Sequence, residues 1–174
     1  MNSEARKPGK DAESPALSLG VLFAAVTLPL YLLDQVSKWA VLTHLELDTE
    51  ILPVIPGFFA LVHWRNTGAA FSMLSDSNGF FIGLSAVALI VLAVLGWRGK
   101  FRDRPSRLGW AMLLAGILGN LTDRIWHGSV VDFLLFDFHI RYANPWPAFN
   151  VADACIFCAA ALFLWQSFRE PAGE

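Results

Sequence analysis

Residues 79–97 read GFFIGLSAVALIVLAVLGW and contain no charged side chain. A helix needs about 20 mostly apolar residues to cross the hydrocarbon core of a bilayer, so this stretch predicts a membrane span. Three more apolar stretches of similar length lie at about 16–42, 108–126 and 151–168. We therefore expect an all-α membrane protein with four transmembrane helices.

The composition of the whole chain also indicates a membrane protein. Of the 174 residues, 55% are hydrophobic and 16% are charged, whereas soluble domains carry about 25% charged residues. The net charge of −2 gives no reason to expect nucleic acid as a partner. The two cysteines, Cys155 and Cys158, lie in the last apolar stretch without the further ligands of a structural zinc site. We expect no metal and no cofactor.

Basic residues predict how the spans are oriented. They gather before the first span, between the second and third, and after the fourth. They are Arg6, Lys7, Lys10, Arg98, Lys100, Arg102, Arg104, Arg107 and Arg169. These segments lie on one side of a four-span chain, so we expect that side and both termini in the cytoplasm. The first span ends without a convincing small-x-small cleavage site, which favours an uncleaved helix.

The remaining segments give the predicted domain organisation. Residues 1–15 are polar and are expected to form a disordered cytoplasmic tail, followed by one membrane domain at 16–170. Two segments of that domain, at about 43–78 and 127–150, fall on the outer, periplasmic side. Within the first, residues 51–64 are apolar and β-prone with turn formers among them, which predicts a small sheet. The second contains Asn-Pro-Trp-Pro and is expected to be a turn or mobile loop.

Several polar side chains interrupt or adjoin the apolar spans, where a charge costs on the order of 2.5–3.5 kcal/mol. They are Asp34, Lys38, Asn120, Asp123, Arg124, Asp132 and Asp153. The predicted topology places all of them near the outer membrane boundary. Such a cluster indicates either an active site or an ion network that locks the helices together.

Two pairs within this cluster have a simple structural explanation. Asp34 and Lys38 are spaced i, i+4, so they are able to pair on one face of the first helix. Asp123 and Arg124 are interpreted as a second pair that locks helices together. Both pairs are therefore expected to support the fold more than the chemistry.

Asp132 and Asp153 are the candidates for catalysis. Asn150 is able to cap the fourth helix, and the carboxylate of Asp153 suits the positive end of its dipole, which does not exclude a catalytic role. Asp132 has no such explanation, because it lies in the apolar sequence SVVDFL. Two adjacent aspartates in a low-dielectric site share one proton, so one can activate water while the other polarises a peptide carbonyl.

Other chemistries have less support in the sequence. There is no His-Glu-x-x-His motif and no Gly-rich phosphate loop, and the four histidines are scattered. Ser129 lies close to His127, but no known pattern supports this pair as nucleophile and base. A carrier of ions or protons that uses the same carboxylates is the non-enzymatic alternative.

Five motifs give the chain a resemblance to the lipoprotein signal peptidases, also called signal peptidase II. In chain order they are DQVSK at 34–38, NTGAAFS at 66–72, GILGNLTDR at 116–124, VVDF at 130–133 and FNVAD at 149–153. The resemblance extends from about residue 31 to the end of the fourth span. Ala115 and Ala154 replace a glycine and a serine that are common in the family, and neither change removes a catalytic group.

The resemblance implies an aspartic endopeptidase of the bacterial inner membrane with its active site near the outer face. Its substrates would be diacylglyceryl-modified prolipoproteins, cut just before the lipidated cysteine, and the cyclic peptide globomycin would be its inhibitor. Besides substrate, we expect contact with membrane lipids, no nucleic acid, and a monomer. A factor that binds lipoproteins without cutting them is a further alternative.

The resemblance also implies roles for individual residues. Asp132 and Asp153 take the positions of the catalytic pair. The positions that bind substrate or shape the site are matched by Asn66, Gly68, Asn120, Asp123, Arg124 and Asn150. Asp34 and Lys38 match a pair that supports the fold.

Overall fold

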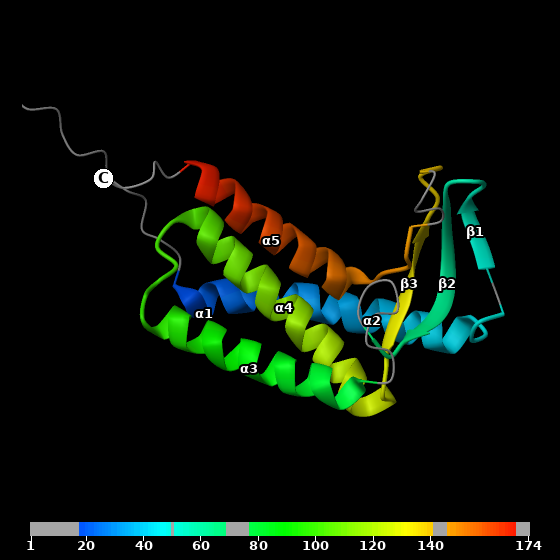
Figure 1. The fold of residues 1–174 in the computed structure, drawn as a ribbon, viewed down its shortest axis with the longest axis horizontal. Coiled ribbons are helices and arrows are strands. Elements are labelled where there is room, and N and C mark those ends of the chain that lie inside the picture. Colours follow the sequence, from blue (N-terminus) through cyan, green and yellow to red (C-terminus); the bar gives the residue numbers. More distant parts are fainter. Residues whose placement is uncertain (1–17, 50, 69–76, 141–145, 170–174) are drawn as a thin grey trace, which may run out of the picture.

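The computed structural model describes residues 18–49, 51–68, 77–140 and 146–169. The helices are α1 (Leu19–Leu22), the π-helix η1 (Phe23–Thr27), α2 (Leu28–His44), α3 (Asn78–Trp97), α4 (Arg104–His127) and α5 (Val151–Arg169). The strands are β1 (Ile51–Ile55), β2 (Phe59–Asn66) and β3 (Val130–Phe136). The helices lie side by side and the sheet stands at one end of them (Figure 1). The predicted tail at 1–15 lies outside the described residues.

Three helical stretches are long and apolar enough to cross a membrane, namely Leu19–His44, Asn78–Trp97 and Val151–Arg169. Each agrees closely with a stretch predicted from the sequence. The fourth predicted stretch corresponds to α4, whose polar residues lower its mean hydropathy. Because α4 packs against α2, α3 and α5, many of its side chains face protein and not lipid. A fourth span therefore stays a prediction.

The end of the bundle away from the sheet has an apolar core that contains a few satisfied polar groups. Leu22, Leu92, Trp110 and Leu114 pack together there. The Trp110 indole donates a hydrogen bond to the Leu92 carbonyl at 3.0 Å. The hydroxyl of Thr27, fully buried, donates to the Ala111 carbonyl at 2.9 Å. Such bonds are needed because no water satisfies polar groups inside a bilayer.

Two glycines allow α4 to approach α2 and α5 closely. A Cβ atom on Gly119 would lie 2.5 Å from an Asp34 carboxylate oxygen and 3.0 Å from the Ala152 Cβ. A Cβ atom on Gly116 would collide with the Ala152 carbonyl oxygen and the Ile156 side chain. Small residues commonly permit close helix contacts in membranes. Because Gly116 and Gly119 have no side chains, α4 packs closely enough against α2 and α5 for Asp34 to lie next to the start of α5.

Gly119→Ala should destabilise the protein by about 1–3 kcal/mol, because the added methyl group overpacks this contact. The measurement is the thermal unfolding midpoint of the detergent-solubilised protein. Gly83→Ala is the matched control, since Gly83 also lies inside a helix but a methyl group added there would meet no atom within 4 Å. Equal midpoints for the two variants would contradict the packing described.

The sheet is antiparallel with the strand order β1-β2-β3. The small sheet predicted from residues 51–64 is confirmed by β1 and β2. The loop predicted for residues 127–150 is wrong in part, because residues 130–136 form β3. A short apolar run has no distinctive periodicity, so the sequence does not separate a buried strand from other structures. Residues 144–145 of the predicted turn lie outside the described residues.

Strand β3 fixes the position of Asp132. In the register with β2, Asp132 is opposite Trp64, Val131 is opposite Arg65 and Val130 is opposite Asn66. Val131 and Phe133 pack with Val41 of α2 in a second apolar cluster. The sheet therefore holds Asp132 against the end of the helices.

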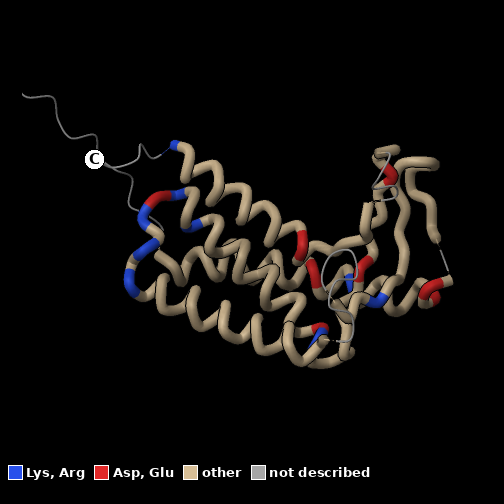
Figure 2. Tube along the Cα trace, viewed as in Figure 1, with Lys and Arg blue, Asp and Glu red and all other residues tan. Residues whose placement is uncertain are grey.

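Basic residues gather at the opposite end of the bundle from the sheet (Figure 2). They lie in the connection between α3 and α4, at the start of α4, and at the end of α5. This grouping agrees with the distribution read from the sequence. Which end faces the cytoplasm stays a prediction.

Candidate active site

The polar residues singled out in the sequence converge where α2, α4 and α5 meet the sheet. All but one are buried, and Asp153 is half-buried. The buried ones are Asp34, Lys38, Asn120, Asp123, Arg124 and Asp132. Most of them are joined by direct hydrogen bonds and ion pairs, which form one connected network.

Lys38 is the centre of this network. Its ammonium nitrogen lies 2.8 Å from Asp34 Oδ2 and 2.8 Å from Asp123 Oδ2. It also donates a hydrogen bond to Asn120 Oδ1 at 3.1 Å. The three donors of the ammonium group are therefore all used. The predicted contact between Asp34 and Lys38 is present, and Lys38 also binds a second carboxylate.

The predicted pair of Asp123 with Arg124 is wrong. Consecutive residues of a helix do not face each other, and Asp123 turns to Lys38. Arg124 instead donates to the Gly68 carbonyl at 3.0 Å, and its guanidinium lies 4.9 Å from the centre of the Phe81 ring. Arg124 thus connects α4 to the segment after β2.

The two carboxylates bound to Lys38 also hold the backbone beside each candidate aspartate. Asp34 Oδ1 accepts a hydrogen bond from the backbone N–H of Ala152 at 2.8 Å. Asp123 Oδ2 accepts one from the backbone N–H of Val131 at 3.1 Å. These residues directly precede Asp153 and Asp132 in the chain. Lys38 therefore ties together the two backbone segments that carry the candidate catalytic groups.

Both oxygens of Asp132 accept hydrogen bonds from asparagines. Oδ1 accepts from Asn150 Nδ2 at 2.8 Å, and Oδ2 accepts from Asn66 Nδ2 at 2.9 Å. The residue is only 4% exposed. Its burial agrees with its position in the apolar sequence SVVDFL.

Asp153 forms a reciprocal cap with Asn150 at the start of α5. The backbone N–H of Asp153 donates to Asn150 Oδ1 at 2.9 Å, and the backbone N–H of Asn150 donates to Asp153 Oδ2 at 3.2 Å. The predicted capping role of Asn150 is thereby confirmed. The other oxygen of Asp153 accepts from Asn120 Nδ2 at 2.7 Å.

Asn150 is the residue that both aspartates share. It is fully buried, its side-chain nitrogen contacts Asp132, and its oxygen and backbone contact Asp153. The same nitrogen lies 3.2 Å from Asn120 Oδ1, which fixes the orientation of both amides. Asn120 and Asn150 thus fix the orientation of the carboxylates of Asp132 and Asp153.

Burial and, to a lesser degree, the negative charge of Asp153 raise the pKa of Asp132 to about 7. The hydrogen bonds from Asn66 and Asn150 and the charge of Lys38 act the other way. Asp132 therefore gains and loses its proton near neutral pH. That behaviour suits a pair of carboxyl groups that share one proton.

The segment after β2 contacts the site through Asn66 and Gly68. The backbone N–H of Gly68 donates to Asn66 Oδ1 at 3.0 Å, which orients the Asn66 amide toward Asp132. Gly68 is buried, and Arg124 holds its carbonyl. Residues 69–72 of the sequence motif lie outside the described residues.

Sequence reasoning did not single out Gln35 or Asn78. The Gln35 amide donates to Asp34 Oδ2 at 3.0 Å and to Asp123 Oδ1 at 3.3 Å, so it supports both carboxylates. Its place next to Asp34 in the DQVSK motif was the available signal. Asn78 donates to the Arg124 carbonyl at 3.1 Å and had no signal in the sequence.

Comparison with known proteins identifies the family of the chain. The family model described as signal peptidase (SPase) II matches residues 26–169, which include every residue of the network. The chain belongs to the signal peptidase II family. The lipoprotein signal peptidase of Yersinia enterocolitica is 39% identical over 164 residues, covering 91% of this chain and 93% of that protein. The Yersinia pestis protein is 39% identical over 163 residues, covering 90% and 92%.

Solved structures of bacterial membrane enzymes, determined by the in meso method, have the same fold as this chain. One at 2.3 Å resolution has a TM-score of 0.76 and 28% identity, covering 87% of this chain and 93% of that one. Another at 1.9 Å has a TM-score of 0.75 and 27% identity, covering 86% and 94%. The arrangement of helices and sheet is therefore shared with experimentally determined relatives.

If Asp132 shares a catalytic proton with Asp153, the cleavage rate should fall as the pH rises through about 7, because Asp132 then loses that proton. Asn66→Ala should move this fall to higher pH, since the hydrogen bond from Asn66 lowers the Asp132 pKa. The measurement is the pH profile of kcat/KM for both proteins. An unchanged profile, or a shift to lower pH, would contradict the assignment of this fall to Asp132.

Proposed function

We propose that Asp132 and Asp153 are the catalytic pair with which this member of the signal peptidase II family removes the signal peptide from prolipoproteins. The observation that carries the proposal is their shared partner Asn150, which holds Asp132 by its side chain and Asp153 by its cap. Membership of the family supports an aspartic peptidase that acts on prolipoproteins. Its substrate would be a prolipoprotein that carries a diacylglyceryl group. The cut would fall just before the lipidated cysteine.

The chemistry follows from one shared proton. The charged carboxylate takes a proton from a water molecule, and the water oxygen attacks the carbonyl carbon of the scissile peptide bond. The protonated carboxyl group donates a hydrogen bond to the carbonyl oxygen, which becomes negative as the bond to water forms. The tetrahedral intermediate then collapses, the C–N bond breaks, and a proton passes from the pair to the leaving amine. Asn66, Asn120 and Asn150 keep the carboxylates oriented throughout.

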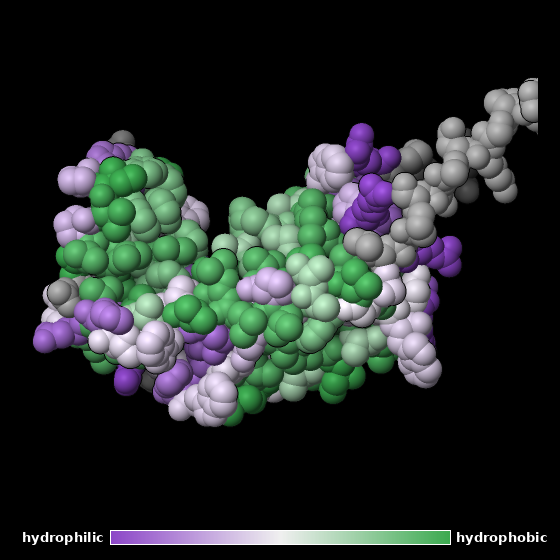
Figure 3. All heavy atoms as spheres, turned by 180° about the vertical axis from the view of Figure 1, so that it is seen from behind, coloured by the Kyte–Doolittle hydropathy of each residue, from purple (hydrophilic) through white to green (hydrophobic). Residues whose placement is uncertain are grey.

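We infer that the substrate reaches the site from within the bilayer. On the face shown in Figure 3, apolar side chains cover much of the helical body, and the surface is hollowed between the helices and the sheet. Trp39 of α2 and Ile125 of α4 are exposed at 62% and 61%, which suits contact with acyl chains. The segment at Asn66 and Gly68 would hold the extended peptide beside Asp132.

The proposed placement is a four-span protein of the bacterial inner membrane, acting as one membrane domain and a monomer. The basic end of the bundle would lie in the cytoplasm with both termini, and the aspartates near the outer face. Globomycin is the inhibitor expected for such an enzyme.

Lipoproteins of cells that lack the protein provide the test. Mass spectrometry should show precursors that carry the diacylglyceryl group and still retain the signal peptide. The parent gene should restore cleavage, and a gene encoding Asp153→Asn should not. Normal processing of lipoproteins in cells that lack the protein would exclude the peptidase function. The alternative function, a carrier of ions or protons, would then be favoured. Restoration by Asp153→Asn would reject the catalytic pair and leave the family activity.

A further inference from the structure

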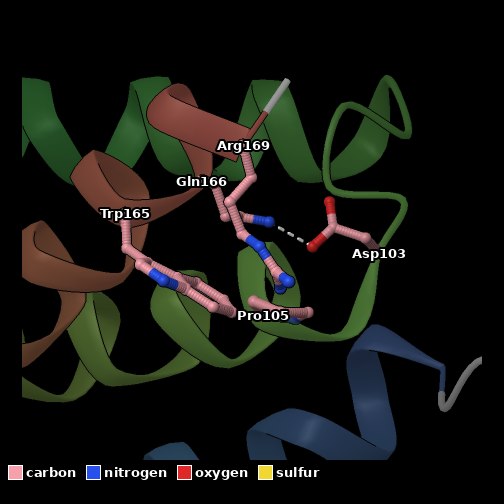
Figure 4. A pocket seen from close by; sticks show the side chains of 5 residues that line it. All are labelled: Asp103, Pro105, Trp165, Gln166 and Arg169. Carbon is pink, nitrogen blue, oxygen red and sulfur yellow. Dashed lines mark hydrogen bonds between the residues drawn. The ribbon is translucent and has the colours of Figure 1, made fainter. Parts of the chain in front are cut away.

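A shallow groove lies at the end of the bundle opposite the catalytic network. It is lined by Asp103, Pro105, Trp165, Gln166 and Arg169, and its volume is about 390 Å³ (Figure 4). The groove is formed where α4 begins and α5 ends. Its residues take no part in the hydrolysis described above, so the groove needs a separate explanation.

Asp103 forms one wall of the groove and is already engaged by neighbouring donors. Its carboxylate caps α4, accepting from the backbone N–H of Ser106 at 2.8 Å and from the Ser106 hydroxyl at 2.7 Å. The Gln166 amide of α5 also donates to this carboxylate (Figure 4). These bonds join α4 to α5 and occupy most of the acceptor positions of the carboxylate.

Arg169 supplies the charge of the groove. Its side chain turns back so that the guanidinium lies 4.5 Å from the centre of the Trp165 ring and beside Pro105 (Figure 4). Stacking on an aromatic ring leaves the N–H edge of a guanidinium open to a phosphate, which it binds in a bidentate manner. No ion pair to Arg169 occurs among residues 18–49, 51–68, 77–140 and 146–169.

The surroundings of the groove favour an anionic ligand. Residues 98–107 contain five basic side chains and a single acidic one, Asp103. They lie at the same end of the bundle as Arg169 (Figure 2). A positive field of this kind attracts phosphate and repels a cationic peptide such as the basic start of a signal peptide.

The apolar neighbours of the groove indicate that the phosphate belongs to a lipid. Trp165, Leu164 and Phe168 of α5 are exposed at 47%, 59% and 80%. Tryptophan rings are typical of the membrane interface, where headgroups meet acyl chains. Basic pockets between membrane helices are known to bind anionic lipid headgroups.

We propose that this groove binds the headgroup of an anionic phospholipid, with Arg169 contacting the phosphate and Trp165 packing against the glycerol and upper acyl chains. The lipid would belong to the leaflet opposite the catalytic network. The proposal rests on the membrane placement given under the proposed function, but not on the identity of the catalytic residues.

The test measures lipid binding to the full-length protein in detergent by native mass spectrometry. Phosphatidylglycerol should bind the parent more tightly than phosphatidylcholine does. Arg169→Gln should bind phosphatidylglycerol about tenfold more weakly, the usual effect of losing one charge-assisted contact. Arg98→Gln is the matched control, because Arg98 is an exposed arginine at the same end that does not line the groove. It should keep the affinity of the parent.

Each other outcome overturns the proposal. Equal weakening by Arg98→Gln and Arg169→Gln would show diffuse attraction without a site. Competition by inorganic phosphate at the concentration of the lipid would indicate a site for free phosphate. Binding of a lysine-rich peptide that is lost in Asp103→Asn would assign the groove to a signal peptide. Cleavage of prolipoprotein by Arg169→Gln should equal that of the parent, so the result is independent of the catalytic proposal.

Discussion

Asp132→Asn and Asp153→Asn should each slow the cleavage of prolipoprotein by about 10²- to 10⁴-fold, the usual effect of removing a general acid or base. Asparagine has nearly the same shape as aspartate, so the helix cap and the strand should persist. It neither accepts a proton from water nor shares one with the remaining carboxyl group. The measurement is the initial rate with purified, detergent-solubilised enzyme and a lipid-modified substrate.

Asp137→Asn is the matched control for this prediction. Asp137 follows β3 and lies 2.7 Å from the exposed His139 ring, and it has no contact with Asn66, Asn150 or Lys38 among the bonds described. Its variant should cleave at the rate of the parent. Full activity in Asp132→Asn or in Asp153→Asn, with normal protein levels, would exclude the catalytic pair.

Lys38→Met should destabilise the protein by about 3–5 kcal/mol, the usual cost of removing one partner from a buried ion pair. The change leaves Asp34 and Asp123, which are 1% and 2% exposed, without the cation between them. It also releases the backbone at Val131 and Ala152, so cleavage should slow as well. The measurement is the free energy of unfolding in detergent, obtained by titration with a denaturing detergent.

Lys100→Met provides the control for Lys38→Met. Lys100 is exposed in the connection between α3 and α4 and has no ion pair within the described parts of the chain. Surface charges of this kind contribute little to stability, so the unfolding free energy should match that of the parent. If Lys38→Met were as stable as Lys100→Met, Lys38 would not be the centre of the network.

Much of the fold followed from the apolar spans, because bilayer thickness sets the length of a membrane helix. Much of the site followed from the cost of placing polar groups in or beside those spans, which singled out Asp34, Lys38, Asn120, Asp123, Arg124, Asp132 and Asp153. The family motifs then added Asn66 and Asn150. In the structure Asn66, Asn120 and Asn150 contact Asp132 or Asp153 directly.

Other features depend on contacts between segments far apart in the chain. The binding of Asp123 to Lys38 depends on how α4 rotates against α2, and the spacing within α4 does not specify it. Strand β3 pairs with β2, although the periodicity of residues 130–136 alone does not distinguish a buried strand from a buried helix. The backbone bonds of Asp34 and Asp123 to Ala152 and Val131 have no signature in the sequence at all.

The claim that Asp132 and Asp153 act as one unit is tested most directly by a double-mutant comparison. Cleavage of a purified diacylglyceryl-modified prolipoprotein would be measured with the parent, Asp132→Asn, Asp153→Asn and the double variant, in the presence of a metal chelator. When two residues act as one unit, removing the second costs little once the first is gone. The double variant should therefore cleave about as fast as the slower single variant. A double variant slowed by the product of the two single effects would contradict a shared role, as would loss of parent activity in the chelator.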